Sequence, residues 1–136
     1  MQLRLGSCTS LDDIAVRVCT RVIGHYPQHR MLLIDCGWTG CSAQGKDVGY
    51  GAIEGHPELT IKQLKQEAGE VEVAAIEADG GAPITAASLI ERYPIGSILK
   101  IVPWHSCAAT AMHRVLHVAN EAGAIVDEYA ICSAAW

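Results

Sequence analysis

Short runs of alternating apolar and polar residues, each interrupted by glycine or proline, are the feature that most restricts how this chain can fold. Residues 14–23 (IAVRVCTRVI) place Ile14, Val16 and Val18 on one side of an extended backbone and Arg17 on the other. Side chains of a strand point alternately to its two faces, so this period of two predicts a half-buried strand. Few segments show the longer period of an amphipathic helix. The pattern therefore favours a mainly β fold.

Further extended segments follow at short intervals. We expect strands at 31–35 (MLLID), twice within 58–78 with a join near Gly69, at 95–107 with a sharp end at Pro103, and as a hairpin of 115–120 and 124–134. Residues 36–55 and 79–83 are rich in glycine and predict turns, the first around short extended pieces.

Residues 84–94 predict one or two helical turns that stop before Pro94. Many short strands with little helix are typical of a barrel or a sandwich. We therefore predict a mainly β fold, with residues 1–136 forming a single antiparallel β-barrel-like domain that carries one or two short helices.

Composition and charge exclude several classes of partner. The formal net charge is −5, and the 10 Lys and Arg are scattered among 15 acidic residues, so no basic face for nucleic acid is expected. No apolar run approaches the roughly 18 residues that span a bilayer, and the N-terminus lacks the apolar segment of a secretory signal. We expect no membrane partner, a cytoplasmic location and reduced thiols for the six cysteines.

The segment 101–110 (IVPWHSCAAT) carries the strongest candidate for chemistry. If residues 98–107 stay extended, His105 and Cys107 share a face, with Cα atoms roughly 6.5–7 Å apart. An imidazole nitrogen and a thiolate could then bind one zinc ion, at about 2.1 Å and 2.3 Å. A zinc site needs three or four protein ligands. The remaining ligands must come from elsewhere in the fold, a partner chain or a substrate, and the alternative is that both residues are ordinary ones.

Weaker candidates lie elsewhere. Cys36 and Cys41 have a spacing that some zinc loops use, although two small residues in a turn explain it equally. His113 and His117 would share a strand face, with His113 able to approach the His-x-Cys segment. Asp35 follows a buried strand, where it could serve a site or satisfy local backbone N–H groups.

PWHSC resembles the Pro-x-His-x-Cys motif of the D-serine dehydratase and D-threonine aldolase family, which are pyridoxal-phosphate enzymes of the alanine-racemase type. Other segments are similar to the family as well: the strand and turn MLLIDCGWTGCS, the turn LKQEAGEV, the strand YPIGSILKIV and the closing hairpin at the C-terminus. The resemblance covers the chain from about residue 12 to its end.

The resemblance implies that this chain corresponds to the C-terminal β-domain, which in the family follows an α/β barrel. The barrel carries the lysine that binds the cofactor, whereas Lys46, Lys62, Lys65 and Lys100 here do not lie in a barrel-strand context. The chain is thus expected to be a fragment, a separate gene product or a truncated one, with no catalytic residue of its own and no activity alone. Pyridoxal phosphate would be reached only through the missing barrel.

The resemblance also implies that His105 and Cys107 bind zinc, or another divalent metal, which contacts the hydroxyl or carboxylate of a D-amino-acid substrate. The partner would be the N-terminal barrel or a second subunit, and an exposed apolar surface is expected where the barrel packs.

Two departures from the family pattern stand out. Its Glu-His-Gly element reads Glu67, Ala68 and Gly69, and a small hydroxyl residue is replaced by Ala109, with Thr110 next to it. A diverged, non-catalytic interaction module and a small free-standing metal-binding protein are therefore the alternative functions.

Overall fold

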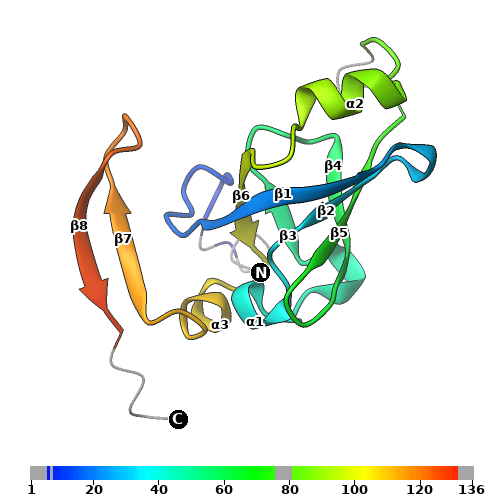
Figure 1. Cartoon of the computed structure of the whole chain (residues 1–136). Helices are drawn as coiled ribbons and strands as arrows, with labels where there is room; N and C mark the ends of the chain where they lie inside the picture. The colour runs from blue at the N-terminus through cyan, green and yellow to red at the C-terminus, as the bar shows by residue number, and fades with distance from the viewer. Residues whose placement is uncertain (1–5, 7, 76–80, 132–136) are drawn as a thin grey trace.

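Six antiparallel strands curve into a nearly closed barrel, as predicted (Figure 1). The computed structural model describes residues 6, 8–75 and 81–131. The strands are β1 (Val18–Tyr26), β2 (Met31–Ile34), β3 (Gly51–Ile53), β4 (Leu59–Leu64), β5 (Gly69–Val73) and β6 (Ile98–Pro103). Their order is β3-β6-β1-β2-β5-β4, and the edge strands β3 and β4 approach each other. Cys132 and the ends of two predicted strands, 76–78 and 132–134, lie outside the described residues.

Strand β1 joins the two halves of the barrel because its first part pairs with β6 and its second part with β2. A bulge between Val22 and Gly24 lies just after the point where pairing passes from β6 to β2. Such a bulge increases the local twist, so it lets one strand serve both halves of a curved sheet. Val18, Thr20 and Val22 face the core on the predicted period of two.

The predicted bounds of this strand, 14–23, need correction. The Arg17 guanidinium donates to the carbonyl oxygens of Ile14 and Val16, which holds residues 14–17 in a local turn outside the sheet. At its other end the strand runs on to Tyr26, because this residue still pairs with Met31 of β2. The Arg17 side chain, which binds nearby backbone, therefore sets where the strand begins. Pairing with β2, which lies outside the predicted segment, sets where it ends.

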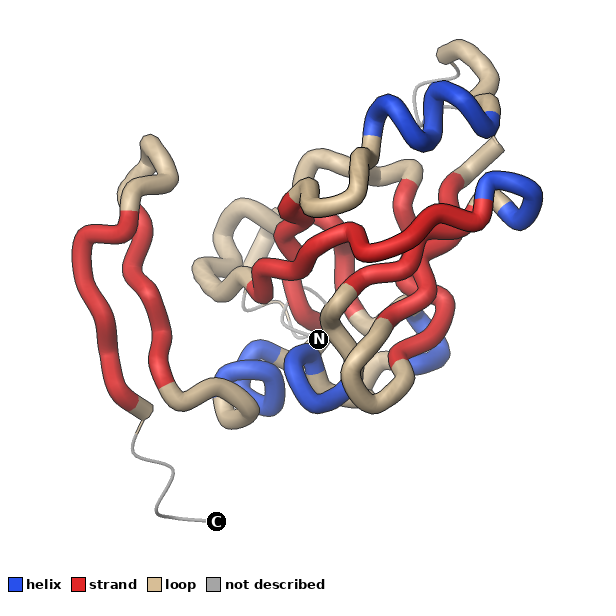
Figure 2. The backbone as a smooth tube through the Cα atoms, viewed as in Figure 1, coloured by secondary structure: helices blue, strands red, loops and turns tan. Residues whose placement is uncertain are grey.

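Short helices close the ends of the barrel (Figure 2). α2 (Ala86–Arg92) is the predicted helix, and it ends at Tyr93, before Pro94. Thr85 and Ser88 form a reciprocal cap at its N-terminus. α1 (Trp38–Cys41), α3 (Ser106–Thr110) and the 3-10 turns η1 (Pro27–His29) and η2 (Lys46–Val48) are shorter. Among the described residues, no helix combines the length and apolar character needed to cross a membrane.

The core lies inside the barrel and is mainly aliphatic. Its most buried strand residues come from every barrel strand except the edge strand β3: Val22, Leu32, Ile34, Ile61, Val71, Val73 and Ile101, each at most 1% exposed. Ile53 of β3 is 4% exposed. Tyr93 and Tyr50, at 1% and 4% exposed, are the aromatic members of the same core.

A hairpin of β7 (Val115–Ala119) and β8 (Ile125–Ala130) follows α3 and stands apart from the barrel (Figure 1). The hairpin was predicted, with its turn at Gly123, where φ is +79°. The position of the hairpin relative to the barrel was not predicted, because the alternating pattern gives no information about what the two strands pack against.

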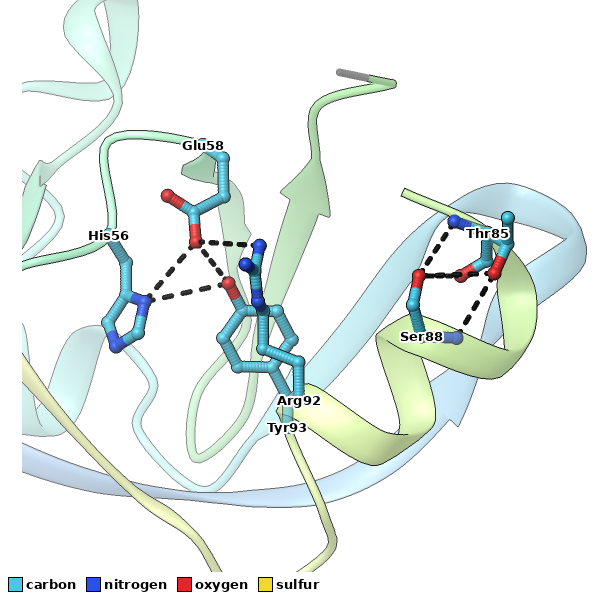
Figure 3. A network of polar contacts seen from close by, with 6 residues as sticks. All are labelled: His56, Glu58, Thr85, Ser88, Arg92 and Tyr93. Carbon is cyan, nitrogen blue, oxygen red and sulfur yellow. Dashed lines mark hydrogen bonds and ion pairs between the residues drawn. The ribbon is translucent and has the colours of Figure 1, made fainter. Parts of the chain in front are cut away.

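A buried polar network fastens α2 to the β3–β4 connection (Figure 3). The Tyr93 hydroxyl donates to Oε1 of Glu58, and Nδ1 of His56 lies 3.3 Å from the same oxygen. Arg92 approaches it at 3.9 Å. Burial of Glu58 favours its neutral form, but the hydrogen bonds from Tyr93 and His56 outweigh burial and hold its pKa below the ordinary value.

We predict that Tyr93→Phe lowers the free energy of unfolding by about 1–3 kcal/mol at pH 7, because Glu58 loses its closest donor. The folded pKa of Glu58 lies below its ordinary value of 4.5. Its contribution is therefore present above about pH 4.5 and is lost as the pH falls through the folded pKa. The loss in the variant should shrink between pH 7 and pH 3.5, as measured by urea unfolding.

Tyr26→Phe is the matched control, since Tyr26 is 41% exposed on β1, and we expect it to change stability by less than about 0.5 kcal/mol. An equal loss in both variants, or a Tyr93→Phe loss that does not depend on pH, would contradict the assigned role of the network.

Candidate metal site

The His-x-Cys segment leaves the sheet immediately after β6. The Trp104 N–H donates to the Tyr50 carbonyl oxygen at 2.8 Å, and His105 precedes the first turn of α3. Cys107 lies within that helix, so the prediction that residues 98–107 stay extended is wrong. Pro103 ends the ladder because it has no N–H, and the Ser-Cys-Ala-Ala-Thr sequence then takes up helical hydrogen bonds back to His105.

The change from strand to helix alters the directions of the two side chains but not their proximity. Two peptide units keep the Cα atoms of His105 and Cys107 within roughly 7 Å in any conformation. Cys107 is exposed and His105 half-buried, so solvent reaches both residues. Whether they bind a metal together stays a prediction.

Gln44 is the residue near this site that the sequence did not reveal. Its side-chain Oε1 accepts a hydrogen bond from Nδ1 of His105, 61 residues further along the chain. With the amide oriented in this way, the ring proton sits on Nδ1, and Nε2 carries the lone pair that a metal ion requires. A partner of this kind on the second ring nitrogen is the usual support of a metal-binding histidine.

Backbone geometry holds Gln44 in place. Its N–H donates to the Ser42 hydroxyl at 3.2 Å, and the following Gly45 has a φ of +81°. A Cβ at Gly45 would overlap Cγ of Trp104. Glycine is therefore required twice here, by its left-handed backbone and by the tryptophan ring against it. The Trp104 ring thus packs against Gly45, and Gln44, the residue before Gly45, binds His105.

The turns that resemble family motifs meet beside α1. Trp38 N–H donates to the Lys65 carbonyl at 2.8 Å, and Thr39 binds Gln66 through its N–H and its hydroxyl. A Cβ on Gly37 would overlap the Gln66 carbonyl oxygen, and one on Gly69 would lie 2.7 Å from that of Cys36. The segment 31–42 and the β4–β5 turn are therefore joined by a close backbone contact that only glycine allows.

The departures from the family pattern fall on positions with clear structural roles. Ala109 is fully buried and belongs to the core, whereas Thr110 is half-buried. Ala68 lies in the β4–β5 turn, where its carbonyl accepts from the Lys65 N–H at 2.7 Å. Neither alanine disturbs the fold around the motif.

The weaker candidates have structural partners. Cys36 and Cys41 are both buried, and a hydrogen bond between their side chains, together with burial, raises the pKa of Cys36 above the ordinary value. Asp35 accepts from the Thr20 hydroxyl and the Arg21 N–H, each at 2.7 Å, so its carboxylate joins β2 to β1. The backbone N–H that Asp35 satisfies is thus on the neighbouring strand rather than in its own turn.

The two later histidines do not share a strand face. His113 lies before β7, and its Nε2 donates to the Gly40 carbonyl of α1 at 2.8 Å. His117 lies on β7 and pairs with Glu128 of β8 at 3.0 Å. Within the residues that the structure describes, no group of three or more His, Cys, Asp or Glu side chains could hold a metal ion.

A cleft of about 360 Å³ opens at the seam between β3 and β4, away from the His-x-Cys segment. Arg17, Glu54 and His56 are among its lining residues, and the Arg17 Nε lies 2.6 Å from Oε1 of Glu54. His105 and Cys107 do not line it. The candidate metal ligands are therefore not part of this cleft.

Residues 15–119 match the family described as "Putative serine dehydratase domain". Two curated relatives are similar over most of this chain. D-serine dehydratase of Dictyostelium discoideum is 30% identical over 95% of the chain, which covers 32% of the relative. D-threo-3-hydroxyaspartate dehydratase of Delftia sp. HT23 is 32% identical over 79% of this chain, and the match covers 29% of the relative. The chain thus spans about a third of these relatives.

Solved structures show the same fold. The Delftia dehydratase superposes with a TM-score of 0.73 and 28% identity, over 93% of this chain and 34% of that one. Its structures include two alanine variants, one at a histidine and one at the cysteine two positions later, and the cysteine variant is in a metal-free form. D-threonine aldolase from Filomicrobium marinum, at 16% identity and a TM-score of 0.61 over 84% of this chain and 27% of that one, shares the fold.

We predict that Gly45→Ala lowers the free energy of unfolding by about 2 kcal/mol or more, because it combines left-handed strain with a clash against Trp104. Gly55→Ala is the control, since Gly55 has a φ of +72° but a Cβ added there would meet no atom within 4 Å. Urea unfolding should show a loss of only about 1 kcal/mol for the control. Equal losses would mean that Trp104 does not pack against this loop.

Proposed function

Because this chain belongs to the serine dehydratase domain family, we propose that it is the metal-bearing C-terminal β-domain of a pyridoxal-phosphate-dependent D-amino-acid lyase. The reaction class is removal of water from a D-3-hydroxyamino acid, since both relatives at 30% identity or more are named dehydratases. The chain would act only together with a barrel domain that holds the cofactor, and residues 1–136 would form one domain of that enzyme.

The His-x-Cys pair carries this proposal. Structures of the Delftia dehydratase are named for alanine variants at a histidine and at a cysteine with this same spacing, the latter described as metal-free. In the present chain His105 is half-buried and Cys107 is exposed, and the Gln44 contact gives the imidazole the tautomer of a metal ligand. One imidazole and one thiolate favour zinc over magnesium or calcium.

His105 and Cys107 would hold the ion from one side and leave its other positions open. When bound, the zinc ion would act as a Lewis acid on the β-hydroxyl of the substrate. Gln44 orients the His105 ring, and Trp104, packed on Gly45, limits its movement. Two protein ligands suit a site that substrate and water complete, whereas a purely structural zinc site would need four.

Three of the four lysines of this chain are engaged in ion pairs. Lys62, Lys65 and Lys100 pair with Glu72, Glu70 and Glu54 on the outer surface of this chain's β-barrel, and Lys46 is exposed on η2. The group that binds pyridoxal phosphate is therefore assigned to the barrel domain, and no residue of this chain is given that role.

We predict that the purified chain binds one zinc ion, and that His105→Ala or Cys107→Ala weakens binding at least about a hundredfold, measured by calorimetry. His117→Ala is the matched control because His117 pairs with Glu128 on the hairpin. Zinc binding that all three variants retain would overturn the metal assignment.

The enzyme function has its own test. Joining this chain to the first two-thirds of the Dictyostelium D-serine dehydratase, in place of that enzyme's matched part, should give a zinc-dependent dehydratase that His105→Ala inactivates. A folded, cofactor-loaded chimera that binds zinc but forms no keto acid from D-serine or D-threo-3-hydroxyaspartate would favour a diverged, non-catalytic module.

We further predict that Gln44→Ala weakens zinc binding about 10- to 100-fold, because the ring of His105 loses the partner that fixes its tautomer. Gln28→Ala, on the exposed turn η1, should leave the affinity unchanged. Equal affinities for the two variants would show that Gln44 does not support the ligand.

A further inference from the structure

The hairpin arm, defined as residues 115–130, has unusually exposed strands. All six residues of β8 are exposed, and β7 alternates between exposed and half-buried residues. The arm projects from α3 and lies beside the barrel with open space around both strands in the ribbon view (Figure 1). The six-stranded barrel, by contrast, buries one side of nearly every strand.

The side chains on the arm are those of a buried sheet. Leu116 lies opposite Tyr129, and Val118, two residues further along, shares their face. Tyr129 is 59% exposed and Ile125 57% exposed, whereas Val126, also 59% exposed, is skipped by the pairing of β7 with β8. Such an exposed group of large apolar residues on one element marks a surface that another protein covers.

Energetics lead to the same conclusion. A two-stranded hairpin is at best marginally stable in water unless a third strand, a helix or another surface covers one face. The arm gains one ion pair, between His117 and Glu128, but both side chains are more than half exposed, so the pair contributes little. The regular pairing of β7 with β8 therefore needs a cover that the described residues of this chain do not provide.

The relatives indicate what the cover is. The Delftia structure covers 93% of this chain, so at most about 10 of the 136 residues are unmatched, whereas the arm has 16. The arm is thus at least partly shared with an enzyme of which this chain covers only 34%. The remaining two-thirds of that polypeptide is the part that could cover it.

We propose that the hairpin arm is the docking surface for the cofactor-binding barrel domain, which covers its Leu116, Val118 and Tyr129 face. This inference rests on the proposed function, because that function supplies the barrel. Asp127 lies opposite Val118, on the same face, so the complementary surface on the barrel is apolar with a basic side chain at its rim.

The arm also positions the metal site. Only residues 111–114 separate α3, which carries Cys107, from β7. Docking of the arm therefore fixes the orientation of the His-x-Cys segment relative to the cofactor-binding barrel domain. His105 and Cys107 then face the same domain that the arm binds.

Hydrogen exchange of the isolated chain and of the Dictyostelium chimera tests this proposal. Amides of β7 and β8 should exchange at least about 10-fold faster than those of β1 and β6 in the isolated chain, and become at least about 10-fold slower in the chimera. Tyr129→Glu should abolish that protection. Ile95→Glu should leave it intact, since Ile95 is a 66% exposed residue on this chain's own six-stranded β-barrel.

Two results would overturn the proposal. One is an arm that stays unprotected in a folded, cofactor-loaded chimera. The other is an arm already protected in the isolated chain, with sedimentation showing a dimer that Tyr129→Glu dissociates, because the cover is then a second copy.

Zinc titration of the same samples separates this inference from the proposed function. Loss of arm protection with zinc binding and dehydratase activity retained removes the docking role alone. Arm protection without zinc binding at His105 and Cys107 removes the metal function and leaves the docking surface standing.

Discussion

The hydrogen bond from the Trp104 N–H to the Tyr50 carbonyl fixes the point at which the chain leaves the barrel. Trp104 follows Pro103, the last residue of β6, and its ring lies against Gly45. From there His105 reaches Gln44, and α3 carries Cys107 out to the surface. The arrangement of the candidate metal site therefore depends on one strand end and on one glycine that makes room for a ring.

Local patterns in the sequence predicted the barrel strands because their period of two reflects burial of one face. They did not predict where β1 begins, because Arg17 binds the carbonyl groups of its own segment. Residues 106–110 form a helix although only their two alanines are strong helix formers, and the apolar run before them predicted a longer strand. Gln44 had no signal in the sequence, since its contact with His105 spans 61 residues.

The residues of the His-x-Cys segment made it the strongest candidate, the family resemblance implied a metal-binding role for it, and the structure adds what surrounds it. Close backbone contacts at Gly37 and Gly69 explain why glycine stands in both neighbouring motifs. The replacement at Ala109 falls on a core position rather than on the surface of the site. The substitution at Ala68 leaves the backbone of its turn intact, because that turn is held through the carbonyl group.

The candidate metal site and the hairpin arm are close in the sequence, because only residues 111–114 separate α3 from β7. X-ray absorption at the zinc edge of the zinc-loaded chain reports directly on the ligands that His105 and Cys107 are proposed to supply. We expect one sulfur at about 2.3 Å and one imidazole nitrogen at about 2.0–2.1 Å, with oxygen ligands completing the shell. A shell of four protein nitrogen and sulfur ligands, or of oxygen ligands alone, would contradict the proposed site.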